Sequence, residues 1–371
     1  MMANNYTDDY AILVGISKYW DNDYFPELKG PPNDLDLMTG WLTSPDGGNV
    51  NPEHITRISS PDNIKIGANT DNFPPGYAEF FSAYKKLVTD EKGTFKHFPS
   101  RLYLYFSGHG FCERISENPQ ATLYAAMATP NMAENIAGTD YANKTKENAI
   151  FNEIVLIMDC CRDAEFTRPI QKAPINISGN SNSSNVKLFC IYAAPKGGKA
   201  QERRIDDKYY SLFTHAFFKA FSEVKPHSSP FDKITSTELK NHLLESWSII
   251  CGDSPVPEPE FVLPNNGEIK FHAKKSPIRQ NFKLLSFLES FTVIEIRDSE
   301  LNTIVSCELY PNSDVIKVKW RDNRGSETLD FKNKMFTLEL LPDYYQYELS
   351  GGLNNSGLFA VVSGGVQHVQ L

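Results

Sequence analysis

Short apolar runs alternate with amphipathic segments over the first two thirds of the chain. The clearest apolar runs are residues 10–16 (YAILVGI), 101–108 (RLYLYFSG), 153–159 (EIVLIMD) and 186–194 (VKLFCIYAA). Uninterrupted runs of this length are typical of strands buried on both faces of a sheet. Between and after them, residues 75–91 and 211–221 carry their apolar side chains at helical spacing. The alternation predicts a three-layer α/β/α architecture with a mostly parallel central sheet.

A further helix is predicted directly after the first strand, in the segment NDLDLMTGWLTS. Leu35, Met38 and Leu42 recur there at helical spacing. Asn33 or Asp34 suits the N-cap, because a short polar side chain can accept a hydrogen bond from the unpaired N–H groups of the first turn.

The pattern changes near residues 274–281 (KKSPIRQN), which we interpret as a linker. Beyond them apolar and polar residues alternate with period two, as in FTVIEIRD and DVIKVKW, with turn residues between the segments. The sequence therefore predicts an α/β domain over residues 1–273 and a small all-β, sandwich-like domain over residues 274–371. Within the first domain, residues 163–186 are rich in Ser, Asn, Pro and Gly and are predicted to form an exposed loop.

Composition excludes some classes of partner. The 371-residue chain has a formal net charge of −9 and no basic block, so we expect no nucleic-acid partner. No apolar run approaches the length of a membrane span, and the N-terminus lacks the basic start of a secretory signal. We therefore expect no membrane partner. The six cysteines include no CxxC pair, so we expect free thiols and a cytoplasmic location.

Candidate chemistry follows two of the predicted strands. His109 follows one strand, and Cys160 and Cys161 follow the next. Catalytic groups collect at the carboxyl ends of strands in open parallel sheets, and a cysteine nucleophile needs a nearby base. Gly110 permits close approach of the backbone, so its N–H and that of the cysteine are candidate donors to an oxyanion. Either residue type alone is more often a packing residue, and spacing does not separate Cys160 from Cys161.

With these residues the chain resembles the caspase-like cysteine peptidases of clan CD (peptidase C14), most closely the metacaspase and bacterial caspase-like branch. The resemblance covers roughly residues 8–250 and rests on YAILVGISKY, LKGPPNDLDLM, LYFSGHG, IMDCCRD and YSLFTHAF. The QACxG signature of animal caspases is absent. The Asp-x-Cys pattern of metacaspases implies that Cys161 is the nucleophile, Cys160 a packing residue and His109 the catalytic histidine.

The same resemblance implies substrates with a basic P1 residue, held by Asp34 and Asp159. Helix capping for Asp34 and an ordinary polar strand end for Asp159 stay open as alternatives. Lys29 lies near the position where animal caspases bind an acidic P1, which leaves an acidic preference open as well. Many metacaspases require calcium, but Asp140, Asp163 and Glu165 do not define a site, so we expect no cofactor and assign no metal ligand. Arg162 and Asp163 depart from the family pattern and receive no role.

We therefore expect a cysteine endopeptidase that cleaves protein or peptide substrates after Arg or Lys through a Cys-His dyad. The resemblance implies a zymogen activated by processing or by a partner, in a bacterial-type defence or cell-death pathway. Lys172–Ala173 is a candidate processing bond, and the bonds after Arg203 and Arg204 are other candidates. The C-terminal β domain is the candidate surface for an activating protein. The alternative is a catalytically inactive caspase-like scaffold. A cysteine phosphatase is excluded, because no arginine stands six positions after Cys160 or Cys161.

Overall fold

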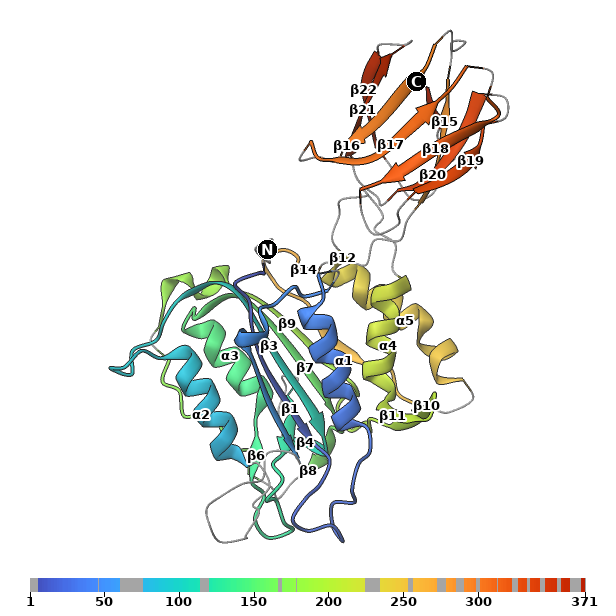
Figure 1. Cartoon of the computed structure of the whole chain (residues 1–371). Coiled ribbons are helices and arrows are strands. Elements are labelled where there is room, and N and C mark those ends of the chain that lie inside the picture. Colours follow the sequence, from blue (N-terminus) through green and yellow to red (C-terminus); the bar gives the residue numbers. More distant parts are fainter. Residues whose placement is uncertain are drawn as a thin grey trace, which may run out of the picture. The chain divides into compact units, whose positions relative to one another are not determined.

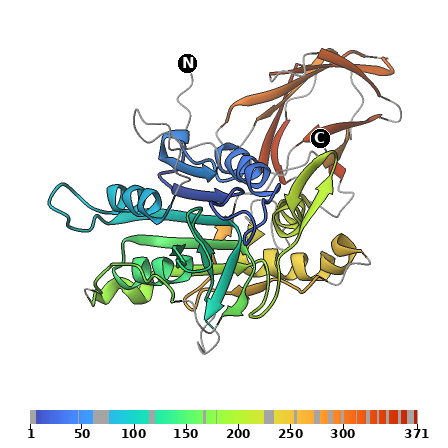
Figure 2. The ribbon, with the colours of Figure 1, turned by 90° about the horizontal axis from the view of Figure 1, so that it is seen from below.

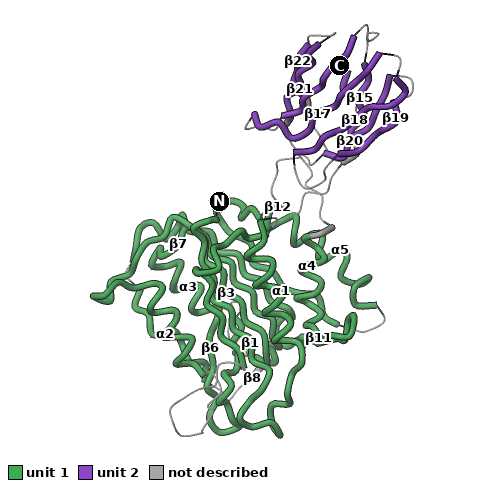
Figure 3. Tube along the Cα trace, in the orientation of Figure 1, with its two compact units in different colours: residues 1–224, 234–273 green, residues 225–233, 274–371 purple. Residues whose placement is uncertain are grey.

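The computed structural model describes most of the chain (Figure 1). The described residues are 6–45, 47–60, 76–113, 120–165, 169–177, 179–223, 234–252, 256–271, 278–284, 290–297, 301–311, 313–321, 326–331, 334–340, 344–351, 355–360 and 368–370. The chain divides into two compact units, coloured separately in Figure 3. Unit 1 comprises residues 1–224 and 234–273, and unit 2 comprises residues 225–233 and 274–371.

The central sheet of unit 1 has the strand order β13-β9-β7-β3-β1-β2. Its parallel strands are β1 (Tyr10–Ile16), β2 (Ile55–Ser60), β3 (Phe98–Gly108), β7 (Phe151–Cys160) and β9 (Lys187–Tyr192). At one edge, β13 (Glu260–Val262) runs antiparallel to β9. The predicted mostly parallel sheet is therefore confirmed.

Helices cover both faces of this sheet, which gives the predicted three layers. In β1, Ile12 and Val14 pack into one apolar core, and Ala11 and Leu13 pack into a second core on the opposite face. The first core includes α2 (Tyr77–Val88) and α3 (Gly138–Glu147), and the second includes α1 (Pro31–Thr43), α4 (Leu212–Glu223) and α5 (Ser236–Cys251). The two groups of helices lie on either side of the sheet in Figure 1. A strand buried on both sides has no polar face, which explains its uninterrupted apolar sequence.

Smaller elements follow the carboxyl ends of the parallel strands, which lie at the bottom of Figure 1 and face the viewer in Figure 2. A second sheet has the order β6-β5-β4-β8, and β10 and β11 form a hairpin. Their bounds are β4 (Gly110–Glu113), β5 (Thr122–Tyr124), β6 (Asn135–Ile136), β8 (Asp163–Glu165), β10 (Glu202–Ile205) and β11 (Lys208–Ser211). Because β4 follows β3 and β8 follows β7, His109 and Cys161 lie where the two sheets meet.

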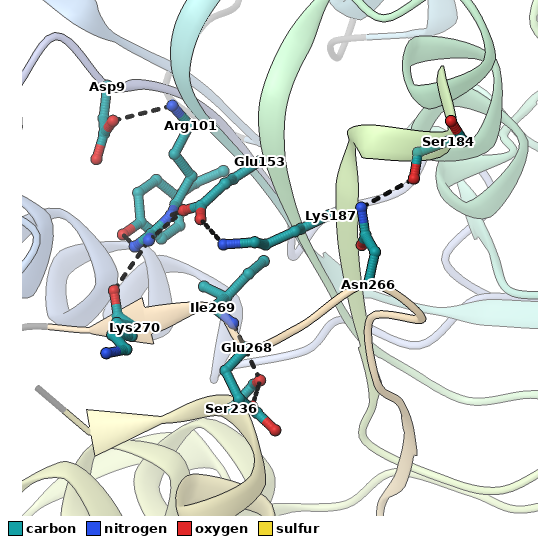
Figure 4. Close-up of polar contacts among 11 residues, drawn as sticks. Asp9, Arg101, Glu153, Ser184, Lys187, Ser236, Asn266, Glu268, Ile269 and Lys270 are labelled. Atoms are coloured by element: carbon teal, nitrogen blue, oxygen red, sulfur yellow. Dashed lines mark hydrogen bonds and ion pairs between the residues drawn. The ribbon is translucent and has the colours of Figure 1, made fainter. Parts of the chain in front are cut away.

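Charged side chains join the strands at the amino end of the sheet (Figure 4). Glu153 binds Arg101 (Nη2 to Oε2, 2.5 Å) and Lys187 (Nζ to Oε1, 3.0 Å). The Arg101 guanidinium also donates to the carbonyl of Lys270 at 2.9 Å. Lys270 belongs to β14 (Lys270–Phe271), which pairs with β12 (Ile234–Thr235). This network fixes β3, β7, β9 and β14 to one another at the end of the sheet away from His109 and Cys161.

The described strands of unit 2 form two sheets around one apolar core. Their orders are β19-β18-β17-β16-β21-β22 and β20-β15-β23. The strands are β15 (Ile278–Lys283), β16 (Thr292–Arg297), β17 (Thr303–Leu309), β18 (Val315–Trp320), β19 (Ser326–Asp330), β20 (Met335–Leu340), β21 (Tyr344–Gly351), β22 (Asn355–Ala360) and β23 (His368–Gln370). Ile294 and Val318 of the first sheet and Phe282 and Leu338 of the second belong to this core, so the arrangement is a β-sandwich.

Two local predictions differ from the structure. Helix α1 begins at Pro31 with Gly30 as its N-cap, so the N-cap prediction for Asn33 or Asp34 is wrong. Proline suits the first turn because it lacks the N–H that would stay unpaired there. Within the predicted exposed loop, Ala173 and Ile175 are buried against the core. A composition rich in Ser and Asn does not reveal such a tertiary contact.

The segment around Ala173 is also hydrogen-bonded to α3. The Ala173 N–H donates to Asp140 Oδ2 at 2.7 Å, and Lys144 Nζ donates to the Ala173 carbonyl at 2.5 Å. The described part of unit 1 also contains the 3₁₀ turns η1 (Pro52–His54) and η2 (Ser181–Asn185). No helix in the described part of the chain is both long enough and apolar enough to cross a membrane.

Candidate active site

The register between β3 and β7 brings the two strand ends together. Ser107 pairs with Asp159, and Gly108 pairs with Cys160. His109 and Cys161 are therefore the next residues on two neighbouring parallel strands. A histidine and a cysteine that are far apart in the sequence thus reach the same edge of the sheet.

A cavity of about 100 Å³ lies at this edge, between the strand ends, α1 and the β10–β11 hairpin. His109 and Cys161 line it together with three carboxylates, those of Asp34, Asp159 and Glu202. The other lining residues are Leu28, Gly30, Pro31, Ser107, Gly108, Ala200, Gln201 and Ser211. The cavity therefore combines a thiol, an imidazole and a strongly acidic wall.

The His109 ring is held by a backbone carbonyl and by aromatic neighbours. Its Nε2 lies 2.8 Å from the carbonyl oxygen of Pro26. A carbonyl oxygen can only accept, so Nε2 carries the proton and the neutral ring keeps Nδ1 as its basic atom. The rings of Tyr19 and Phe25 pack against the imidazole, with centroids 5.1 and 5.8 Å away. Burial lowers the pKa of His109, so the imidazole is neutral at physiological pH.

The adjacent cysteines occupy different environments. Cys160 is fully buried, and Cys161 is partly exposed in the wall of the cavity. Cys161 Sγ lies 3.6 Å from the carbonyl of Ala200 and can donate to it. Burial raises the pKa of the Cys161 thiol, so the resting group is a thiol rather than a thiolate. A neutral thiol and a neutral imidazole thus line the same cavity.

Two glycines next to His109 permit close packing. Gly108 has a φ of 153°, and a Cβ there would lie 2.7 Å from the Tyr19 hydroxyl oxygen. That oxygen accepts the backbone N–H of His109 at 2.8 Å. A Cβ on Gly110 would lie 2.5 Å from Cys160 Sγ, so Gly110 makes room for the buried cysteine. Gly110 is not among the residues that line the cavity.

Asp34 and Asp159 are buried and hydrogen-bonded from the same side. Asp34 accepts the Ser211 N–H at 3.0 Å and the Ser107 hydroxyl at 3.2 Å. Asp159 accepts the hydroxyls of Ser211 (2.6 Å) and Thr214 (2.5 Å). Ser211 therefore contacts both carboxylates and holds them at one end of the cavity. No cation balances them among the described contacts of these two side chains.

The two carboxylates are costly to ionise because both are buried. Burial raises the pKa of Asp159 to about 6, although its hydroxyl partners oppose the shift. Burial, followed by repulsion from Asp159, raises the pKa of Asp34 well above its usual range. A bound cation would relieve both effects, since it replaces lost hydration and separates the like charges. The cavity thus favours a ligand group with positive charge.

Glu202 is a third acid that the sequence reasoning missed. Its Oε2 accepts the backbone N–H groups of Lys29 (2.9 Å) and Gly30 (2.8 Å), which fixes the hairpin against the start of α1. Only the fold brings residue 202 to this wall, and no motif points to it. Lys29 itself is exposed, with Nζ 4.9 Å from the centre of the Tyr209 ring, and does not line the cavity.

The acids considered for calcium lie in separate contacts. Asp140 binds Lys144 (3.3 Å), and Asp163 lies 3.7 Å from Lys199. The side chain of Glu165 is outside the described part of the structure. Within the described residues, no group of three or more His, Cys, Asp and Glu side chains is arranged to hold a metal ion.

Three comparisons relate the chain to known proteins. The sequence pattern of the caspase domain (peptidase C14) matches residues 8–243. A probable protease from a Desulfuromonadales bacterium is 25% identical over 213 residues, which is 56% of this chain but only 25% of the relative, so the chain spans about a quarter of that protein. Among solved structures, caspase-1 of Spodoptera frugiperda matches with a TM-score of 0.41 and 10% identity, over 69% of this chain and 86% of that one.

Proposed function

Because the caspase-domain match covers residues 8–243, more than half of the chain, the protein belongs to this family of cysteine-type peptidases, and we propose that it cleaves polypeptides after Arg or Lys. One observation carries the proposal. The buried carboxylates of Asp34 and Asp159 line the same cavity as His109 and Cys161. A cavity with this charge is complementary to a guanidinium or an ammonium group.

In the proposed mechanism Cys161 is the nucleophile and His109 is the general base. The Pro26 carbonyl keeps the proton on Nε2, so Nδ1 is the atom that takes the thiol proton as Sγ attacks the scissile carbonyl. The protonated imidazole then gives this proton to the leaving amine, and water hydrolyses the acyl-enzyme with His109 again as base. We assign stabilisation of the oxyanion to the N–H groups of Cys161 and Gly110.

In the same proposal the P1 side chain enters the acidic end of the cavity. Asp34 and Asp159 bind its cationic group, and Glu202 contributes a third negative charge at the hairpin wall. An arginine can engage two carboxylates at once through its planar fork, whereas lysine offers a single point charge. We therefore expect arginine to be preferred over lysine.

A panel of matched peptides tests the proposal. Peptides that differ only at P1 should be cleaved in the order Arg, Lys, then citrulline and Asp, with Arg ahead of citrulline by about 10²-fold in kcat/KM. Citrulline has the shape of arginine without its charge, so this ratio isolates the electrostatic part of recognition. Cleavage after Asp but not after Arg would overturn the assignment of the cavity. No cleavage of any peptide would favour the inactive scaffold.

Cleavage after arginine is expected to weaken in mild acid. The raised pKa of Asp159, about 6, means that this carboxyl takes up a proton as the pH falls below neutrality, so the cavity loses negative charge. Burial lowers the pKa of His109, so this base takes up its proton at a lower pH than an ordinary histidine. We expect kcat/KM for the Arg peptide to fall between pH 7 and pH 5, while the citrulline peptide keeps its rate until His109 is protonated. Parallel profiles for the two peptides would contradict this expectation.

The Lys172–Ala173 bond is expected to stay intact in the folded protein. Its amide N–H is bound by Asp140, and the Ala173 side chain is buried, so the bond cannot enter an active site without local unfolding. Intact mass measurement after prolonged incubation should show no fragment that ends at Lys172, and Lys172→Ala should leave the peptidase rate unchanged. Fragments ending at Lys172 would restore this bond as the processing site. Activation by self-processing would otherwise need another bond.

A further inference from the structure

Arg162, which follows Cys161, is the largest side chain in the described structure that is fully buried. Its Nη1 binds Glu260 Oε2 at 2.5 Å and the Ala194 carbonyl at 3.1 Å, and its Nε donates to the Gln120 carbonyl at 2.9 Å. Its Nη2 is buried with no hydrogen-bond partner. Removing a guanidinium from water is costly, and one incompletely satisfied ion pair is a poor source of stability. The side chain therefore calls for a role other than stabilisation.

The contacts of Arg162 fix the chain next to Cys161. The guanidinium lies 4.3 Å from the centre of the Tyr192 ring, and Tyr192 pairs with Glu260 across β9 and β13. The backbone of Arg162 exchanges hydrogen bonds with Gly197 (2.8 Å) and Gly198 (2.9 Å). The carboxylate of Glu260 thus ties Arg162, the residue after Cys161, to the edge strand β13.

A second arginine, Arg203, ties the β10–β11 hairpin to the end of α5, which precedes β13 in the chain. Arg203 of β10 follows Glu202, and its guanidinium donates to the carbonyls of Ile250 (3.3 Å) and Cys251 (2.9 Å) at the end of α5. Carbonyls at a helix C-terminus are unpaired and carry partial negative charge, so a cation is favourable there. We call the described residues 250–252 and 256–260 the α5–β13 segment. It lies after residue 243, where the family match ends.

We propose that the α5–β13 segment is a positioning element for the active site. Through Glu260 it holds Arg162, and with it the loop of the nucleophile. Through the carbonyls of Ile250 and Cys251 it holds Arg203, and with it the hairpin that carries Glu202. Arg162 and Arg203 are positioning residues, because neither lines the cavity. The proposal rests on the proposed function, in which Cys161 attacks and the hairpin forms part of the substrate site.

Two variants with matched controls test this division of roles. Glu260→Gln removes the charge that holds Arg162, and the exposed Glu258→Gln is its control. Arg203→Met removes the contact between the hairpin and the end of α5. Arg204→Met is its control, since Arg204 is 61% exposed and binds only Asp207 among its described ion pairs. The readouts are kcat, KM for the Arg peptide, and the rate of alkylation by iodoacetamide. Alkylation reports on Cys161, because the other five cysteines are buried.

The expected results differ for the two arms. Glu260→Gln should lower kcat by roughly 10- to 100-fold, slow alkylation by roughly 10-fold and leave KM within about twofold, because a small displacement of a reacting atom is costly. Arg203→Met should raise KM roughly 10-fold with alkylation unchanged, because a mobile hairpin must be ordered on binding. The proposal would be overturned if kcat, KM and the alkylation rate of both variants equalled those of their controls. It would also be overturned if both variants lost activity equally and in proportion to their unfolded fraction.

A double variant covers the case in which Glu260→Gln does not fold. Arg162→Met combined with Glu260→Leu leaves no unpaired charge, and replacement of a buried ion pair by apolar residues is often neutral for stability. This variant should fold and still show the reduced kcat and the slower alkylation. Wild-type kcat in the double variant would refute the positioning role. If the wild type cleaves no peptide, the proposed function fails, while the alkylation comparison still tests the position of Cys161.

Discussion

Cys161→Ala is expected to abolish cleavage of the Arg peptide, with a loss in kcat of about 10⁶-fold. The thiol forms the acyl-enzyme in the proposed mechanism, and an alanine offers no substitute nucleophile. Because Cys161 lies in the wall of the cavity and is partly exposed, its truncation creates no buried void, so the melting temperature should stay unchanged. The measurement is steady-state cleavage of the Arg peptide, together with a thermal unfolding curve of the same sample.

The adjacent cysteine supplies the control. Cys160→Ala removes one buried sulfur atom that packs against Gly110, which should cost on the order of 1 kcal/mol in the free energy of unfolding. Its kcat should stay close to that of the wild type. The assignment of the nucleophile would have to be reversed if Cys160→Ala were inactive and Cys161→Ala active.

Asp159→Asn is expected to lower kcat/KM for the Arg peptide by roughly 10²- to 10³-fold and to leave the citrulline peptide almost unaffected. The substitution keeps the shape of the side chain and removes a charge at the end of the cavity. Asp34→Asn should act in the same direction, because Asp34 also lines the cavity and its substitution removes a second negative charge there. The ratio of the two peptides in each variant is the decisive quantity, since it cancels general losses of activity.

The same substitution should not destabilise the free protein. The folded pKa of Asp159, about 6, lies above the usual aspartate value of 3.8, so the folded state binds more protons than the unfolded state between these values. This carboxyl therefore adds stability as the pH falls through 6 and imposes its full burial cost above it. Asparagine carries no such cost at pH 7, so we expect an equal or higher melting temperature.

A nearby acid on the same helix provides the control for the acidic wall. Asp36 lies two residues after Asp34, but its side chain is 63% exposed and binds Arg57 at 2.7 Å outside the cavity. The control substitution is Asp36→Asn. It should leave both peptides unchanged. An unchanged Arg-to-citrulline ratio in Asp159→Asn and Asp34→Asn alike would contradict the proposed recognition of a basic P1.

The layers of the fold could be predicted because their cause is local. Strands such as β1 and β7 are buried on both faces, so an uninterrupted apolar run identifies each of them. The start of α1 was missed because its N-cap is Gly30, which has no polar side chain, and the helix begins with a proline. The contact of Ala173 with the core was missed because it depends on α3, which composition does not reveal.

The candidate site could be predicted only in part. His109 and Cys161 are visible in the sequence because each follows an apolar strand, and the register of β3 and β7 then sets them side by side. The Pro26 carbonyl that sets the tautomer of His109 is a backbone atom and has no sequence signal. Glu202 and Arg162 owe their roles to contacts with α1 and β13, which only the folded chain brings close.

The tight contact between Gly110 and Cys160 limits which sequences can carry this site. A Cβ at position 110 would lie 2.5 Å from Cys160 Sγ, so the two positions share one small volume. In a library randomised at residue 160, selection for folding should therefore recover Gly, Ala, Ser and Cys and discard larger side chains. The neighbouring position 161 would be restricted by selection for activity instead. Two adjacent codons would thus be kept by unrelated pressures, one by steric fit and the other by chemistry.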